Sequence, residues 1–480
     1  MSIQTPDWVK DAVFYQIFPD RFAYSERLTK PANLESWAAM PTRRGFKGGD
    51  MLGVLEHLDY LEALGVNALY FNPIFESPAN HRYHTHDYFK VDPILGGNAA
   101  FTQLLEAAHK RGIRVMLDGV FNHTGRGFLQ FNHIMENGPQ SPYLDWFTVK
   151  GFPLNAFDEK KRPNYECWWN NRELPKLRTE SQQVRAFICE VAEYWLKVGI
   201  DGWRLDVPLE IKTPGFWEEF RQRVKRANPE AYILAEIWEE AQPWLQGKHF
   251  DAVMDYPFNR ACLGFFGGEA LNTKFKPGGF KLNRLNAKSF ARQIDRMLNL
   301  YDWEVTQVQF NLLSSHDEPR FLSLVGGDKQ RLRLATLFQM AFPGAPSIYY
   351  GDEIGMEGED DPDCRRAFPW DPRWWDQELL EDFRRYTALR RNHPALRRGS
   401  YTTLFANNQT YAFARQTAEE AVVIVLNAGH KPEALTLNLK GVIPDGASLV
   451  EAWSGERLSP EQGKVALTAA PLSSSVWVVG

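Results

Sequence analysis

Acidic side chains recur where short apolar runs of this chain end. Three of them, Asp206, Glu236 and Asp317, follow three different runs and lie far apart along the sequence. No single helix could group residues at such separations, whereas a closed barrel of strands can. Two carboxyls held about 5–5.5 Å apart suffice for double displacement at a sugar carbon, one attacking while the other protonates the leaving oxygen.

Other polar side chains at the ends of these runs complete the set. Arg204 lies two residues before Asp206 and hence on the same strand face, where its charge would keep that carboxylate ionised. His123, His316 and Asp317 could hold sugar hydroxyls as the ring flattens toward its transition state. Taken singly, a strand-end Asp is more often a helix N-cap and a lone His more often structural. The joint arrangement favours a reaction site.

Eight short apolar runs alternate with helical stretches and predict the scaffold that would position these groups. Several helices end in Gly just before the next run, as at Gly65, Gly112 and Gly199, which is the usual chemistry of a helix stop. Eight strands alternating with helices predict an α/β fold, a (β/α)₈ TIM barrel. The expected strands are Val13–Phe18, Val66–Phe71, Ile113–Leu117, Gly202–Leu205, Tyr232–Ala235, Ala252–Met254, Val308–Leu313 and Ser347–Tyr350.

Changes of texture along the chain predict its domains. Residues 1–123 form the first part of the barrel, and the Pro-, Asn- and Trp-rich stretch 124–180 is a subdomain inserted after the third strand. Residues 181–394 complete the barrel, whose last helix is expected at Asp376–Arg391. Short β-rich runs separated by Gly, Asn, Pro and Asp in 395–480 predict a C-terminal antiparallel β-sandwich. Its expected strands are Tyr411–Arg415, Ala421–Leu426, Leu435–Leu439 and Ser475–Val479.

Composition excludes several classes of protein. A net charge of −5 over 480 residues disfavours a nucleic-acid binder that neutralises phosphates. No stretch of about 18 apolar residues indicates a membrane span, and the first residues do not resemble a secretory signal. The cysteines lack CxxC spacing, which is typical of free thiols in a reducing compartment. We therefore expect a cytoplasmic enzyme; the four cysteines are Cys167, Cys189, Cys262 and Cys364.

Short motifs then give a family resemblance that covers the barrel and its insertion. Four of them resemble, in order and on the expected strands, the signature regions of the α-amylase family of glycoside hydrolases. These four are DGVFNH (118–123), GWRLD (202–206), AEIW (235–238) and SSHDEPR (314–320). Further similar stretches are VFYQIFPDRF (13–22), SPANHRYHTHDYF (77–89), LPKL (174–177), FPGAPSIYYGDEIGM (342–356) and DPDCRRAFPW (361–370).

The resemblance implies a role for each matching residue. It makes Asp206 the nucleophile, Glu236 the general acid/base and Asp317 the stabiliser of the transition state. It implies substrate contacts at the following positions: Arg204, His123 and His316 at the cleaved end of the glycone, Tyr83 beneath that ring, Asp118 behind the site, Asp361 and Arg365 at the next sugar inward, and Glu210 and Trp238 nearby.

Within the family, LPKL, Glu210 and the Asn80–Tyr83 stretch (NHRY) most resemble the neopullulanase, cyclomaltodextrinase and maltogenic amylase group. The resemblance implies cleavage of α-1,4 glucosidic bonds in maltooligosaccharides, cyclodextrins or pullulan, with α-1,6 bonds as a further candidate. That group usually carries a sandwich domain before the barrel, which we do not expect here. Leu209 and Glu239 also depart from the group, on the leaving-group side. We expect a monomer or a homodimer.

Two stretches raise the question of a metal ion. His81, His84, His86 and Asp87 are residue types that ligate transition metals, but the resemblance explains them better as a substrate loop. Asp50 resembles part of a calcium site, yet residues 23–30 replace the acidic loop that would complete it. We therefore expect no metal and no cofactor.

Three alternatives stay open at this point. A glucanotransferase or another transglycosylating relative would share the same three carboxylates and differ on the acceptor side. A catalytically silent binding scaffold typically loses at least one carboxylate, and all three are present. A metal-dependent barrel hydrolase would lose its activity in a chelator.

Overall fold

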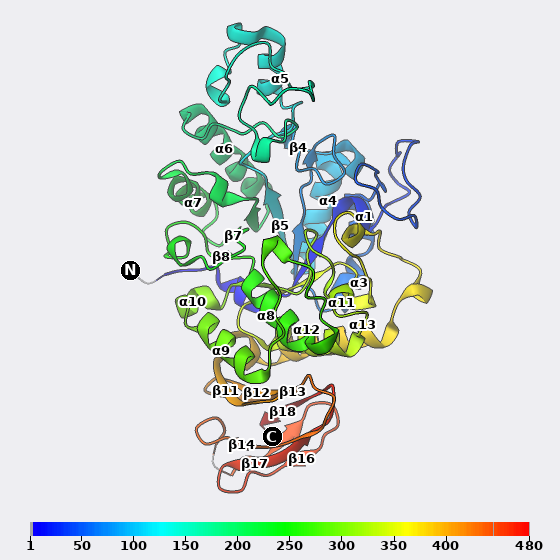
Figure 1. Ribbon diagram of the computed structural model, residues 1–480, viewed down its shortest axis with the longest axis vertical. Coiled ribbons are helices and arrows are strands. Elements are labelled where there is room, and N and C mark those ends of the chain that lie inside the picture. The colour runs from blue at the N-terminus through cyan, green and yellow to red at the C-terminus, as the bar shows by residue number, and fades with distance from the viewer. Residues whose placement is uncertain (1–2, 445, 480) are drawn as a thin grey trace.

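A closed barrel of eight parallel strands forms the centre of the computed structural model, which describes residues 3–444 and 446–479 (Figure 1). The strands follow one another around the barrel in the order β8-β7-β6-β5-β2-β1-β10-β9, and a parallel bridge between Met254 and Phe310 joins the two ends. The predicted (β/α)₈ barrel is confirmed. Its strands are β1 Phe14–Ile17, β2 Ala68–Phe71, β5 Arg114–Gly119, β6 Gly202–Leu205, β7 Tyr232–Ala235, β8 Ala252–Val253, β9 Phe310–Leu312 and β10 Ala345–Tyr349.

Helices surround the barrel, and a two-stranded ribbon of β3 (Phe75–Glu76) and β4 (Asp87–Val91) projects from the loop after β2. The helix expected at Asp376–Arg391 is α13, and the side chain of Asp376 caps it by accepting from Leu379 N. The helices are α1 Pro19–Phe22, α2 Met51–Glu56, α3 Leu58–Ala63, α4 Gly97–Lys110, α5 Leu129–Asn137, α6 Gln182–Val198, α7 Phe216–Ala227, α8 Tyr256–Phe266, α9 Ala287–Leu298, α10 Trp303–Thr306, α11 Phe321–Leu324, α12 Lys329–Ala341, α13 Gln377–Asn392 and α14 Pro394–Arg398.

Two cores hold this architecture together because side chains alternate between the two faces of each strand. Rings such as Phe14, Tyr232 and Phe310 fill the barrel interior, where Phe14 and Phe310 lie 5.2 Å apart between ring centroids. The intervening residues, Trp203 and Leu205 among them, pack outward against the helices. The middle of the barrel is therefore filled with apolar side chains.

The inserted segment after β5 contains α5 and several short 3₁₀ turns, and isolated bridges occur within it and between it and the barrel. One bridge pairs His123 with Lys176, and Figure 1 shows this segment extending away from the barrel at the end opposite the sandwich. The insertion thus brings the LPKL stretch beside the end of β5.

The C-terminal part is an antiparallel sandwich. A six-stranded sheet of order β11-β12-β13-β18-β15-β16 faces the pair β14-β17 across a small apolar core. The four predicted strands are present, and four others accompany them. The bounds are β11 Ser400–Asn407, β12 Thr410–Gln416, β13 Ala421–Asn427, β14 Glu433–Asn438, β15 Leu449–Glu451, β16 Arg457–Leu458, β17 Lys464–Ala469 and β18 Ser473–Val479. Each helix in the described residues is too short or too polar to cross a lipid bilayer.

Candidate active site

Strand register places Asp206 and Glu236 side by side. Leu205 of β6 pairs with Ala235 of β7, and Glu236 N donates to Leu205 O at 3.0 Å. Each acid is the next residue after its paired neighbour, so the two carboxyls leave adjacent strand ends whose backbones are about 4.8 Å apart. Both residues are 8% exposed. The register accounts for how two acids so far apart in sequence face one another.

Arg204 connects three carboxylates from the barrel interior. It is fully buried, pairs in register with Asp118 of β5, and donates through Nη1 to the two Asp118 oxygens at 2.9 and 3.1 Å. The same nitrogen donates to Asp206 Oδ1 at 3.2 Å, and Nη2 lies 2.9 Å from Glu236 Oε2. One guanidinium therefore fixes the relative positions of the two candidate reacting acids and the acid behind them.

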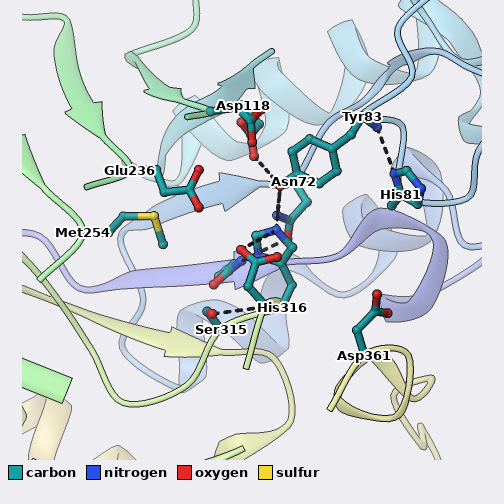
Figure 2. Close-up of polar contacts among 12 residues, drawn as sticks. Asn72, His81, Tyr83, Asp118, Glu236, Met254, Ser315, His316 and Asp361 are labelled. Atoms are coloured by element: carbon teal, nitrogen blue, oxygen red, sulfur yellow. Dashed lines mark hydrogen bonds and ion pairs between the residues drawn. The ribbon is translucent and has the colours of Figure 1, made fainter. Parts of the chain in front are cut away.

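A chain of hydrogen bonds runs from Asp118 to the end of β9 (Figure 2). Tyr83 Oη donates to Asp118 Oδ2 at 3.0 Å and lies 2.6 Å from His316 Nε2. Gln16 Nε2 lies 2.9 Å from His316 Nδ1 and is a donor, so the neutral imidazole carries its proton on Nε2. Burial and the charges of Arg365 and Arg204 hold the pKa of His316 well below its usual value. This imidazole is a neutral donor toward Tyr83 and Asp317.

Asp317 and the loop after β10 meet at the same end of the barrel. Asp317 Oδ2 lies 3.1 Å from His316 Nε2, and its Oδ1 lies 3.5 Å from Arg365 Nη2. Arg365 also pairs with Asp361 at 3.0 Å and donates through Nε to the His316 carbonyl at 2.8 Å. The structure thus links both loop residues that the sequence singled out to the strand-end acids.

Two aromatic contacts position further members of the set. His123 stacks on Trp168 with ring centroids 5.2 Å apart, and its Nε2 is buried without a hydrogen-bond partner in the structure. Burial lowers the pKa of His123 to about 3. Trp238 donates through Nε1 to Glu236 Oε1 at 3.1 Å while stacking on Tyr256 at 3.7 Å, so one face of its ring is already covered.

Glu210 lies in the short helical turn after β6, and its backbone carbonyl accepts a hydrogen bond from Lys176 Nζ at 2.9 Å. Sequence reasoning missed three fully buried polar residues that support the site, Gln16, Tyr70 and Asn72. Tyr70 Oη donates to Asp118 Oδ2 at 2.8 Å, and Gln16 Nε2 donates to Asn72 Oδ1 at 3.0 Å. The sequence signal that could have found them is a polar residue inside an otherwise apolar strand or directly after it.

Burial and mutual repulsion dominate the electrostatics of the acids. Burial, and then the charge of Glu236, raise the pKa of Asp206 well above its usual range. The same two causes raise the pKa of Asp317 to about 7. Two neighbouring buried carboxyls hold one proton between them near neutrality. The charge of Arg204 lowers the pKa of Asp206 but does not offset burial and the charge of Glu236, so the expectation that Arg204 keeps this carboxyl ionised is not met. Glu236 accepts from Val207 N at 3.0 Å and from Trp238 Nε1 at 3.1 Å.

Val207 has unusual backbone geometry directly after the candidate nucleophile. Its φ of 36° and ψ of 52° place a β-branched residue in the left-handed region, where such residues are rarely found. This conformation accompanies the hydrogen bond from Val207 N to Glu236 Oε2. Strain of this kind persists only where the surroundings impose it, and it concentrates at functional sites.

The possible calcium position contains an ammonium group. Lys30 Nζ lies 2.9 Å from Asp50 Oδ2, and that carboxylate also accepts from Ser25 N and Gly53 N at 2.9 and 2.7 Å. Across residues 3–444 and 446–479, His, Cys, Asp and Glu side chains form no group of three or more arranged to hold a metal ion. The side chains around Asp50 are those of a salt bridge and a helix cap.

A (β/α)₈ barrel that gathers paired carboxyls, an arginine and a neutral imidazole at the carboxyl ends of its strands has the architecture of a glycoside hydrolase. Comparison with known proteins agrees. The model of the α-amylase catalytic domain matches residues 16–393, and that of the neopullulanase-like C-terminal domain matches residues 401–478. The chain belongs to the α-amylase family of glycoside hydrolases.

Several relatives are similar over nearly the whole chain. A cyclomaltodextrinase of Geobacillus thermopakistaniensis is 41% identical over 99% of this chain and 78% of its own length. The crystal structure of Ttha1563 from Thermus thermophilus is 51% identical, with a TM-score of 0.93 over 98% of this chain and 99% of that one. The native debranching enzyme of Nostoc punctiforme is 47% identical, with a TM-score of 0.90 over 99% and 100%.

Proposed function

We propose that this enzyme hydrolyses α-glucosidic bonds in maltooligosaccharides, cyclodextrins or pullulan through a covalent glycosyl-enzyme, with retention of the anomeric configuration. The observation that carries the proposal is the register of β6 and β7, which sets Asp206 and Glu236 on adjacent strand ends with Arg204 between them. Two acids on adjacent strand ends that contact the same guanidinium suit double displacement, which needs two carboxyls about 5–5.5 Å apart.

In the proposed first step, Asp206 attacks the anomeric carbon while Glu236 gives its proton to the leaving glycosidic oxygen. The reacting state therefore has the shared proton on Glu236. A glycosidic oxygen next to Glu236 accepts a hydrogen bond only from the protonated acid, so bound substrate favours this state. In the second step Glu236 takes a proton from water, which attacks the same carbon and releases the sugar.

The remaining residues hold the sugar. We assign contacts with the ring at the cleaved bond to Tyr83, His123 and His316. The buried Nε2 of His123, which has no hydrogen-bond partner in the structure, can bind a hydroxyl. Asp317 binds hydroxyls more tightly as the ring flattens, and Asp361 with Arg365 contacts the next sugar inward. Asp118 orients Arg204. Trp238, with one ring face covered by Tyr256, acts mainly through its hydrogen bond to Glu236.

The relatives support the substrate class. One is named a cyclomaltodextrinase and another a debranching enzyme, so both cyclic α-glucans and branch points are acted on by proteins similar to this chain. We therefore propose α-1,4 cleavage with α-1,6 cleavage as a second activity. Measuring kcat/KM on maltotriose, β-cyclodextrin, pullulan, starch and an aryl α-glucoside would rank these substrates.

Transglycosylation is the second candidate. Leu209 is 40% exposed in the turn after β6, on the side that we assign to the leaving group. An apolar side chain there favours a sugar face over water as the acceptor. Product chromatography at high maltotriose should then show products longer than maltotriose; glucose and maltose alone would leave hydrolysis as the sole activity.

One experiment tests the assignment of the acids. Proton NMR of the first product should show the α-anomer before mutarotation, whereas a β-anomer would exclude the double displacement. Glu236→Gln should lower the turnover of maltotriose far more than that of an aryl α-glucoside with a good leaving group, because the latter needs little protonation. An equal loss on both substrates would contradict the acid role.

We also propose that the enzyme works in the cytoplasm, because the four cysteines are free thiols and three of them are buried. A monomer and a homodimer both stay open as candidates, and size-exclusion chromatography with light scattering distinguishes them.

A further inference from the structure

A second cavity lies between the barrel helices and the C-terminal sandwich, and none of its lining residues belongs to the site described above. It is open to solvent and has a volume of about 670 Å³, within the range of pockets that take small ligands. Figure 1 shows α12 and α13 beside the sheet that contains β13 and β18. The lining residues are Gln330, Arg333 and Leu334 of α12, Gln377, Glu378, Glu381, Asp382, Arg385 and Tyr386 of α13, and Trp453, Leu472, Ser473 and Ser474 of the sandwich.

Trp453 provides an aromatic surface in this cavity and is held there by a built turn. Its side chain is 40% exposed, and its ring centroid lies 5.9 Å from that of the buried Tyr386. Glu451, itself only 8% exposed, accepts from Trp453 N at 2.9 Å and from Ser454 N at 2.7 Å, and its other oxygen accepts from Val476 N. A buried carboxylate thus fixes the backbone that presents an indole to solvent.

Ion-paired side chains line the same cavity. Arg333 Nε donates to Asp382 Oδ2 at 2.6 Å, and its Nη2 lies 3.7 Å from Glu378 Oε2. Arg385 lies 3.9 Å from both Glu381 and Asp382. Three carboxylates and two guanidiniums leave no excess of positive charge, so the cavity does not attract phosphate-bearing ligands. The same groups are good partners for neutral hydroxyls.

We propose that this cavity is a second, non-catalytic binding site for an α-glucan chain. A sugar ring has an apolar face that stacks on an indole and a rim of hydroxyls that bind carboxylates and guanidiniums. The cavity combines both features in one place, and the hydrogen bonds to Glu451 hold the turn that carries Trp453, so the backbone loses little freedom when a ligand binds. A chain held here would keep a polymeric substrate attached to the enzyme between cleavage events, which raises its effective concentration at the reaction site.

Gel electrophoresis through soluble starch tests this inference on the full chain in an Asp206→Asn background, which prevents digestion of the gel. Trp453→Ala should lose much of the retardation that the background protein shows, and Trp453→Phe should keep most of it. Trp374→Ala is the matched control, because Trp374 is 76% exposed and lies outside the cavity. All four proteins should migrate alike in a gel that contains a β-glucan.

Kinetics with an intact Asp206 separate this proposal from the proposed function. Trp453→Ala should lower kcat/KM on starch by about three- to tenfold while leaving hydrolysis of an aryl α-maltoside unchanged. Unchanged retardation and unchanged starch kinetics in this variant would overturn the second site, as would equal losses on both substrates. Failure of the parent enzyme to hydrolyse the aryl α-maltoside would instead contradict the proposed function and would leave the binding result readable.

Discussion

At the scale of single residues, the charges of the site depend on Arg204. One buried guanidinium lies against Asp118, Asp206 and Glu236, so three carboxylates share a single cation. The local charge is therefore negative, and protons are retained at ordinary pH. Lysine could not replace this arginine, because an ammonium group cannot present two fixed nitrogens to two different acids.

Because of this excess of negative charge, Asp317 should make the free energy of unfolding depend on pH. Its pKa is about 7 in the folded chain, against 3.8 for an ordinary Asp, so the folded state binds a proton that the unfolded state has already released. The resulting stabilisation is present at acid pH and is lost as the pH rises through 7. Asp317→Asn avoids that loss, and its stability relative to the parent should increase by about 1–3 kcal/mol between pH 5 and pH 8.

Urea unfolding of the parent and of Asp317→Asn at both pH values measures this difference. Asp371→Asn is the control, because Asp371 pairs with Arg373 at the surface and its pKa is lowered rather than raised. The stability of that variant relative to the parent should not increase with pH. A constant offset between Asp317→Asn and the parent would show that Asp317 is ionised over the whole range.

At the scale of elements, the strand ends impose an unfavourable backbone on Val207. A left-handed conformation costs a non-glycine residue about 1–3 kcal/mol, whereas glycine adopts it freely. Val207→Gly should therefore raise the midpoint of thermal unfolding. It should also lower kcat on maltotriose several-fold, because a looser turn holds the Val207 N–H less firmly against Glu236. Calorimetry and steady-state kinetics give both numbers; a variant that is less stable than the parent would mean that valine packing outweighs the strain.

The sequence was sufficient to predict the barrel because its strands are short apolar runs that alternate with helical stretches, and some of them are followed directly by a polar residue, as at Asp206 and Glu236. The sequence also sufficed to pick out the acids and His316 as candidate site residues, because they follow the apolar runs that form β5, β6, β7 and β9. The strands β15 and β16 are only three and two residues long, too short for alternation to be visible. Gln16, Tyr70 and Asn72 were missed because their partners are on other strands, and only the closed barrel brings them together.

At the scale of the whole molecule, one buried arginine joins the sandwich to the barrel. Arg415 of β12 is fully buried and donates to the carbonyls of Ala341 at the end of α12, Leu396 in α14 and Gly399. Leu396 O also accepts from Arg390 Nη1 at 3.2 Å, but the carbonyls of Ala341 and Gly399 would lose their side-chain donor if the guanidinium were removed. Buried polar groups without partners are costly, so this contact couples the unfolding of the two parts.

Arg415→Met should accordingly lower the free energy of unfolding by about 3–5 kcal/mol and split a single calorimetric transition into two, with the sandwich unfolding first. Arg373→Met is a suitable control, because the Arg373 side chain is 87% exposed and bonds only to Asp371 in the structure. Differential scanning calorimetry records both quantities. One transition at the parental midpoint would show that the contact is dispensable.

Closure of the barrel also has a consequence during synthesis on the ribosome. β1 pairs with β10, so Phe14 meets Ser347 only after more than three hundred intervening residues have been made. Until then the nascent sheet has two unpaired edges, which are competent to associate with other chains. The soluble yield should therefore depend more on translation speed and chaperone supply while the last third of the chain is synthesised than while the earlier part is synthesised.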